Sequence, residues 1–147
     1  MNLILPQTAA PVGAYVPAVR HGDLIYTSGQ LPLTDGRLPA TGRVGAEIDP
    51  VEATALARTC ALNAIAAAAA VAGTVDALGG VVKVTGFVAS AAGFHGQPGV
   101  VDGASTLFFE VFGDAGRHAR SAVGVAELPL GSPVEVEAVF ALIRPAG

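Results

Sequence analysis

The stretch DPVEATALARTCALNAIAAAAAVAG, residues 49–73, contains the clearest helix signal in the sequence. Asp49 is a favoured N-cap residue, Pro50 suits the first helical position, and Glu52 lies three positions after the cap, as in a capping box. Alanine and straight-chain residues continue to Ala72, and Gly73 is a residue type that commonly ends a helix. The segment therefore predicts a long helix. The residues that repeat near helical spacing, and that we expect to pack on a sheet, are Ala55, Leu62, Ala66 and Ala69.

Outward from this helix the sequence alternates between strand and helix patterns. A second helix is expected over residues 100–112, with Gly113 ending it. Its expected apolar stripe is Leu107, Phe108, Val111 and Phe112. Strands are expected over residues 15–19, 24–27, 81–89, 121–128 and 134–143. The resulting order, ββαβαββ, predicts an α+β fold with two helices on one sheet.

Side-chain alternation predicts which face of each strand is buried. In the strand over 81–89, Val82, Val84 and Val88 fall on one face. The apolar face of the last strand consists of Val134, Val136, Ala138, Phe140 and Leu142. Its other face carries Glu135 and Glu137, and an acid in a strand rich in valine must be exposed, paired or functional. A solvated outer face explains either acid, taken alone, equally well.

The composition favours one domain that self-associates. The 147 residues fit a single domain, which we expect to cover residues 1–147. Charged residues make up only 14% and hydrophobic residues 52%, so a monomer would struggle to cover its surface with polar groups, and we expect an oligomer. The net charge of −4 and a single lysine, Lys83, argue against nucleic-acid binding, which needs several cations on one face.

The remaining features argue against a membrane, a metal and a disulfide. The N-terminus lacks a signal-peptide pattern, and the longest apolar run, residues 64–72, is too short to span a bilayer, so we expect a cytoplasmic protein. Cys60 is the single cysteine and cannot form an intrachain disulfide. His21, His95 and His118 are far apart and lack metal-ligand spacing, so no metal site is expected.

Four residues outside the last strand could carry chemistry. The Arg120 guanidinium could bind a carboxylate through two hydrogen bonds, although an ordinary ion pair is the more common role of such a residue. Ser28 and Gly29 lie at a strand end, where a ligand can approach the backbone closely, but no GxSxG motif surrounds the serine. Tyr15 could line a pocket or be a half-buried strand residue. Taken singly, these residues indicate no particular function.

Taken together, four segments resemble the Rid family, also called the YjgF or L-PSP family. They are VGAYV (12–16), IYTSGQLP (25–32), HARSAVGVAELP (118–129) and PVEVEA (133–138). Their order and spacing also agree, and the resemblance extends over residues 11–142. It implies a chorismate-mutase-like subunit, with two helices on one face of a mixed sheet, that forms a homotrimer with clefts between subunits.

The best-studied members of this family are cofactor-free deaminases that hydrolyse reactive 2-imino or enamine acids to 2-oxo acids and ammonia. The resemblance implies that Arg120 binds the carboxylate of such a ligand and that Glu135 orients the attacking water, with no cofactor. The residues implied to line the cleft are Tyr15, Ser28, Gly29, Ser121, Ala122 and Gly103. Two of them depart from the family pattern: Ala122 stands where the deaminase archetype carries a cleft cysteine, and Gly103 where it carries an asparagine. Both changes are expected to enlarge the cleft, which indicates a divergent subgroup.

Other functions stay open beside deamination. A trimer with this cleft could bind small carboxylates or 2-oxo acids and regulate another process without turnover, or it could catalyse a tailoring step in a biosynthetic pathway. A ribonuclease is least favoured, because the chain is acidic and lacks a pair of histidines for general-base catalysis. Turnover of an imine would separate the deaminase from the binding protein.

Overall fold

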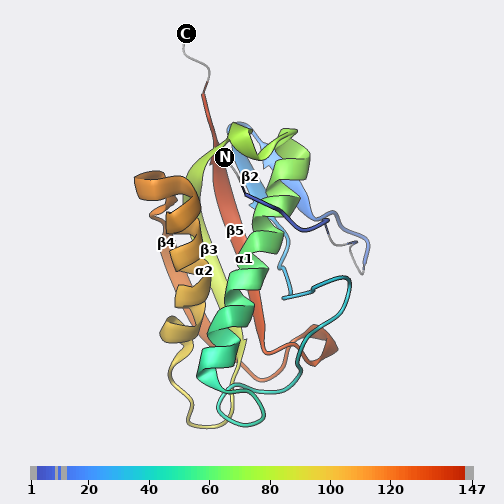
Figure 1. Ribbon diagram of the computed structural model, residues 1–147, viewed down its shortest axis with the longest axis vertical. Helices are drawn as coiled ribbons and strands as arrows, with labels where there is room; N and C mark the ends of the chain where they lie inside the picture. The colour runs from blue at the N-terminus through green and yellow to red at the C-terminus, as the bar shows by residue number, and fades with distance from the viewer. Residues whose placement is uncertain (1–2, 9, 11–12, 145–147) are drawn as a thin grey trace.

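A mixed sheet covered on one face by two helices forms the described part of the chain (Figure 1). The computed structural model describes residues 3–8, 10 and 13–144, so residue 12 of the first matched segment and residue 11, where the resemblance begins, lie outside it. The strands are β1 (Ala18–His21), β2 (Leu24–Thr27), β3 (Leu78–Ala89), β4 (Ala119–Val125) and β5 (Val134–Leu142). The helices are α1 (Pro50–Ala72) and α2 (Gln97–Phe112), with 3-10 turns η1 (Val75–Ala77), η2 (Gly113–Gly116) and η3 (Pro129–Gly131). The predicted ββαβαββ order and α+β class are confirmed.

The strands lie side by side in the order β1-β2-β5-β3-β4. β3 and β4 are parallel, because α2 crosses between them, and the other neighbouring pairs are antiparallel. β5 is the central strand. Its predicted apolar face is confirmed: Val134, Val136, Ala138 and Phe140 are buried in the core with residues of both helices, and Leu142 is partly buried against them. Glu135 and Glu137 therefore lie on the face opposite the helices.

The ends of α1 agree with the sequence prediction, but part of its buried face does not. The Asp49 side chain caps the helix by accepting a 2.8 Å hydrogen bond from the Val51 N–H, and Gly73 ends the helix at φ +97°. Ala66 and Ala69 are buried as predicted, whereas Leu62 is only partly buried and Ala55 is exposed. The buried residues of the first turns are Ala53, Leu56, Ala57 and Cys60. Because alanine occurs on most sides of α1, the sides of the helix differ little in hydrophobicity, and the sequence pattern did not identify the buried side correctly.

The length of α1 also bears on the membrane prediction. The apolar run over residues 64–72 is short, but the whole 23-residue helix is long and apolar enough to cross a membrane by length and composition. In the folded chain, 61% of its most apolar window is buried. Figure 1 shows α1 lying along the sheet beside α2, which is the position of a core helix.

Three strand predictions are wrong at particular residues. Val82 does not share a buried face with Val84 and Val88, because an irregularity in the register between β3 and β5 follows Val81 and leaves Val82 44% exposed. β1 begins at Ala18 rather than at residue 15. The predicted strand over 121–128 corresponds to β4, which begins earlier, at Ala119, and is shorter, because it ends at Val125.

Candidate active site

Glu135 lies in a small pocket beside the end of β2. Its side chain leaves β5 on the face opposite the helices and is half-buried. The pocket has a volume of about 290 Å³. The other lining residues are mainly apolar: Ala10, Tyr15, Pro17, Gly29, Gln30, Leu31, Leu33, Pro129 and Leu130. An acid among apolar groups that still reaches solvent is well placed to transfer a proton to or from a bound ligand.

The electrostatic environment of Glu135 favours its protonated form. Burial raises the pKa of the Glu135 carboxyl above its ordinary value of 4.5, and the negative charge of Glu137 raises this pKa further. Within the described residues, the Glu135 carboxylate has no hydrogen-bond or ion-pair partner. The acid is therefore not committed to a structural contact inside the subunit.

Gly29 lies directly against the Glu135 side chain. A Cβ atom at position 29 would come within 2.7 Å of Glu135 Cδ, so a larger residue would displace the carboxyl group. Tyr15 is 52% exposed and lines the same pocket. Ser28 is the neighbour of Gly29, but its hydroxyl donates a 2.6 Å hydrogen bond to the Val16 carbonyl, so its hydrogen is used by the backbone. The structure thus brings Tyr15 and Gly29 together with Glu135, and ties Ser28 to the segment that carries Tyr15.

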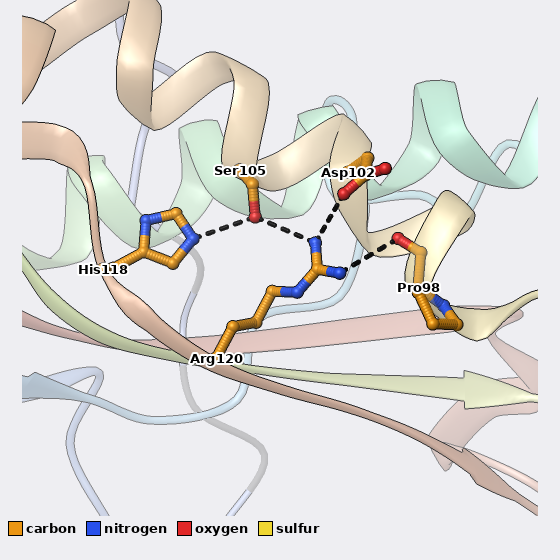
Figure 2. A network of polar contacts seen from close by, with 5 residues as sticks. All are labelled: Pro98, Asp102, Ser105, His118 and Arg120. Carbon is orange, nitrogen blue, oxygen red and sulfur yellow. Dashed lines mark hydrogen bonds and ion pairs between the residues drawn. The ribbon is translucent and has the colours of Figure 1, made fainter.

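Arg120 is held against α2 by three hydrogen bonds (Figure 2). Its Nη1 donates to Asp102 Oδ1 at 2.7 Å and to Ser105 Oγ at 3.1 Å, and its Nη2 donates to the Pro98 carbonyl at 3.3 Å. The contact with Asp102 is also an ion pair, and the arginine side chain is 22% exposed. These contacts hold the guanidinium in one orientation at the β4 edge of the sheet.

His118 supports this arrangement from the far side of Ser105. Its Nδ1 lies 2.7 Å from the Gly116 carbonyl, which can only accept, so Nδ1 carries a proton. In the neutral ring, Nε2 then accepts a hydrogen bond from the Ser105 hydroxyl at 2.9 Å. Because the Ser105 hydrogen points to His118, a lone pair of the Ser105 oxygen is available to Arg120.

One edge of the Arg120 guanidinium remains available. The three contacts use both Nη1 hydrogens and one Nη2 hydrogen, so Nε and the second Nη2 hydrogen make no hydrogen bond within the described part of the chain. In Figure 2, Nε lies on the side of the guanidinium that faces away from Asp102 and Pro98. A pair of N–H donors on one edge matches the two oxygens of a carboxylate.

Arg120 and Glu135 lie on opposite faces of the sheet. Arg120 pairs with Val84 of β3, and Val84 pairs with Ala138 of β5, whose side chain is buried in the core. Paired residues of neighbouring strands share a face, and successive residues of one strand alternate between faces. Ala138 is on the helix side and Glu135 is three residues away, so Glu135 points to the other side. One subunit therefore does not bring the two predicted catalytic residues together.

Cys60 lies beside β5, next to the residue that precedes Glu135, but it is not a candidate nucleophile. It is fully buried, with its sulfur 3.9 Å from the Val134 carbonyl oxygen. Burial raises the pKa of the thiol well above its usual range, and the negative charge of Glu135 raises it further. A thiol in this environment stays protonated and unreactive. In the described part of the chain, no three His, Cys, Asp or Glu side chains form a group that could hold a metal ion.

Comparison with known proteins relates these features to one family. Residues 6–142 match the family described as Endoribonuclease L-PSP. The chain belongs to this family. Among L-PSP relatives, Protein TCP17 of Trypanosoma cruzi is 44% identical over 143 residues, which cover 97% of this chain and 89% of that protein. A 2-iminobutanoate/2-iminopropanoate deaminase of Escherichia coli is 35% identical over 130 residues, 88% of each chain. The crystal structure of the Escherichia coli YjgF gene product is 32% identical, covers 94% of each chain and has a TM-score of 0.68. The predicted Rid, YjgF or L-PSP resemblance is confirmed.

Two further cleft predictions for this L-PSP protein concern β4. Ser121 faces away from the helices, and its Oγ lies 3.4 Å from Lys83 Nζ. Ala122 lies on the helix side, like Arg120, and is partly buried against the core. The L-PSP chain therefore presents a methyl group, and no thiol, two residues after Arg120.

Gly103 is not a cleft residue in the subunit. A Cβ atom at this position would collide with the Thr54 carbonyl of α1, so the glycine allows α1 and α2 to pack closely. The expectation that Gly103 enlarges the cleft is wrong. The residue of α2 that contacts Arg120 is its neighbour, Asp102.

Asp102, Ser105 and Leu130 are among the residues of these two regions that were not predicted from the sequence. Asp102 and Ser105 are polar residues three positions apart on a largely apolar helix, and this spacing places them on the same side. That pattern was available from the sequence, but it did not identify Arg120 as their partner. Leu130, which lines the Glu135 pocket, gave no signal, because a leucine with φ of +60° is not expected from its residue type.

Proposed function

We propose that this chain is a cofactor-independent deaminase that hydrolyses reactive 2-imino or enamine acids to 2-oxo acids and ammonia. The observation that carries the proposal is the presence of two complementary groups. Arg120 has a free edge with two N–H donors, and Glu135 is a half-buried acid with a raised pKa and no partner among the described residues. The 35% identity to a 2-iminobutanoate/2-iminopropanoate deaminase supports the same reaction class.

The chemistry needs positioning and proton transfer. A protonated 2-imino acid carries a carboxylate next to an electrophilic C=N carbon. The free edge of Arg120 would bind this carboxylate and fix the position of the carbon. Glu135 would accept a proton from a water molecule as the water oxygen bonds to that carbon. The same proton would then pass to the amine nitrogen. As the C–N bond breaks and ammonia leaves, the hydroxyl group of the intermediate would give its proton to the Glu135 carboxylate and become the carbonyl.

In this proposal the reaction takes place between subunits. Because Arg120 and Glu135 face opposite sides of one sheet, a ligand that touches both receives them from two copies of the chain. The low charge of the chain and the exposed apolar side chains of the strands support self-association, as a homotrimer in this proposal. Examples of these side chains are Val19, Tyr26, Val82 and Val123.

The test is turnover of imines that are generated in situ, in the assay mixture itself. An amino-acid oxidase produces 2-imino acids from several amino acids, and semicarbazide competes with the purified protein for each imine. We expect the wild-type protein to reduce semicarbazide trapping, and Arg120→Ala and Glu135→Gln each to lower this activity by at least about a hundredfold. Arg117→Ala is the matched control, because Arg117 is 76% exposed and contacts Asp114 and Phe109 rather than either half of the site.

Two results would contradict the proposal. Wild-type protein that matches the enzyme-free control with both small and bulky imines would exclude deamination of these compounds. Full activity of Arg120→Ala would exclude the arginine as the carboxylate anchor. If the wild-type protein binds 2-oxo acids through Arg120 but leaves every imine unchanged, a carboxylate-binding protein without turnover would replace the deaminase.

A further inference from the structure

The Arg120 guanidinium already has a carboxylate bound to it inside the subunit. Asp102 Oδ1 lies 2.7 Å from Arg120 Nη1, the shortest of the three contacts that hold the arginine. Figure 2 shows Asp102 and the Pro98 carbonyl on the same edge of the guanidinium, with Ser105 beside them. A ligand carboxylate cannot bind this edge unless it displaces Asp102. It can bind the remaining edge, formed by Nε and the free Nη2 hydrogen.

The two partners of this ion pair differ in exposure. The Arg120 side chain is 22% exposed, whereas the Asp102 side chain is 63% exposed. The arginine is therefore largely enclosed by protein, and the acid lies on its solvent side. There the negative charge of Asp102 weakens the attraction between Arg120 and an approaching anion. Ser105, oriented by His118, fixes the other Nη1 hydrogen. The hydrogen-bond acceptors thus fix the orientation of Arg120, whereas the negative charge of Asp102 offsets the positive charge of Arg120 and sets the net charge of the pair.

We infer that Asp102 is a positioning residue that sets the carboxylate affinity of Arg120: it presents the Nε edge to the ligand and weakens binding by offsetting the arginine charge. This inference rests on the proposed function only in assigning a carboxylate ligand to Arg120. Its consequence is weak binding of the 2-oxo acid, which retains the carboxylate of the imine. A weakly held carboxylate lets the product dissociate instead of blocking the site.

The two effects of Asp102 can be separated by substitution. In Asp102→Asn the side chain keeps an oxygen that can accept from Nη1 but loses its charge. In Asp102→Ala both the charge and the acceptor are lost, so Nη1 loses its shortest contact. A purely structural role would make both substitutions weaken ligand binding. The inference instead requires that the asparagine variant bind a carboxylate more tightly than the wild-type protein does.

The experiment measures pyruvate binding by calorimetry at fixed pH and ionic strength. We expect Asp102→Asn to lower the Kd for pyruvate by about threefold to tenfold, and Asp102→Ala to bind pyruvate at least about threefold more weakly than Asp102→Asn. Asp114→Asn is the matched control: it also removes one acid, but this acid is 93% exposed and pairs with Arg117, so the Kd should not change. As a readout without ligand, the Arg120 Nε–H resonance should shift in both Asp102 variants and stay in place in Asp114→Asn.

The outcomes distinguish this inference from the proposed deamination. An unchanged or raised Kd in Asp102→Asn overturns the inference, even if the wild-type protein deaminates imines. Equal Kd values for the asparagine and alanine variants overturn the positioning role. Lack of pyruvate binding by both the wild-type protein and Asp102→Asn also overturns it. Conversely, tighter pyruvate binding by Asp102→Asn, in a protein that turns over no imine, supports the inference and contradicts the deaminase.

Discussion

Arg120 and Glu135 point to opposite faces of the same sheet, although they lie on strands separated only by β3. Arg120 contacts α2, which covers one face, and Glu135 opens into the pocket next to Gly29 on the other. The sheet itself prevents the two side chains of one subunit from reaching a common ligand. A function that needs both groups therefore depends on how the copies of this chain assemble.

Complementation between two inactive variants tests this dependence. Arg120→Ala and Glu135→Gln, unfolded together and refolded as a mixture, should regain activity, because some clefts combine the intact Arg120 of one subunit with the intact Glu135 of another. Random assembly of equal amounts would restore about a quarter of the clefts of a cyclic trimer. The measurement is imine turnover by the mixed sample, compared with the sum of the two variants refolded separately. Activity equal to that sum would contradict a shared cleft.

The raised pKa of Glu135 predicts a pH-dependent effect on stability. The folded state keeps the Glu135 proton to higher pH than the unfolded state, whose pKa is near the ordinary 4.5. Between these two pKa values the folded state binds more protons, so this group lowers the free energy of unfolding as pH rises through that window. Glu135→Gln removes the effect. We expect the variant to be more stable than the wild type at pH ~7, by less than about 1 kcal/mol because the half-exposed group is screened by solvent.

Denaturant unfolding of Glu135→Gln and wild type at about pH 4 and pH 7, at one protein concentration, measures this difference. The gain should disappear at the lower pH, where Glu135 is largely protonated in both states. If Glu135→Gln is less stable than the wild type at pH ~7, the prediction is contradicted, because this result would show that the ionised Glu135 carboxylate makes a stabilising contact.

Gly29 is expected to control the place of the Glu135 carboxyl. In Gly29→Ala the new Cβ would lie 2.7 Å from Cδ and 2.9 Å from Oε1 of Glu135, so the carboxyl must move. We expect kcat/KM for imine hydrolysis to fall by at least about tenfold, with the fold retained. Gly99→Ala serves as the control, because a Cβ built at Gly99 meets nothing within 4 Å apart from its chain neighbours and the backbone of its own helix. Full activity of Gly29→Ala would show that the position of the carboxyl does not matter.

Leu130 combines a strained backbone with a place in the Glu135 pocket. Its φ of +60° is costly for a branched apolar residue, and the residue is 64% exposed. Asparagine tolerates this conformation, so Leu130→Asn should raise the free energy of unfolding by about 0.5–1 kcal/mol. The same change removes an apolar wall, and turnover of bulky apolar imines should fall by at least about threefold relative to the smallest imine.

Denaturant titration and a panel of imines measure these two effects of Leu130→Asn. Lower stability would show that the leucine makes contacts that outweigh its backbone strain. An unchanged preference between small and bulky imines would show that Leu130 does not touch the side chain of the substrate.

Much of the fold could be predicted because its signals lie in adjacent residues. Asp49 and Gly73 mark the ends of α1 through local backbone chemistry, and the alternation from Val134 to Phe140 identifies the buried face of β5. Predictions were wrong where contacts with residues far away in the chain determine which side of an element is buried. Val82 leaves the predicted face because of the irregular pairing of β3 with β5, and Ala55 is exposed because of how an alanine-rich helix rotates on the sheet.

The sequence by itself determined the order of the elements, both ends of α1 and the family, since these depend on residue type and spacing along the chain; α2 begins at Gln97, three residues before the predicted start. It also indicated Arg120 and Glu135 as candidate catalytic residues. Only the tertiary structure decided that these two residues face opposite ways, and that Asp102, not Gly103, contacts the arginine. The reason is physical: strand register and helix packing are set by contacts between residues far apart in the chain, and one residue of shift exchanges the two faces of a strand.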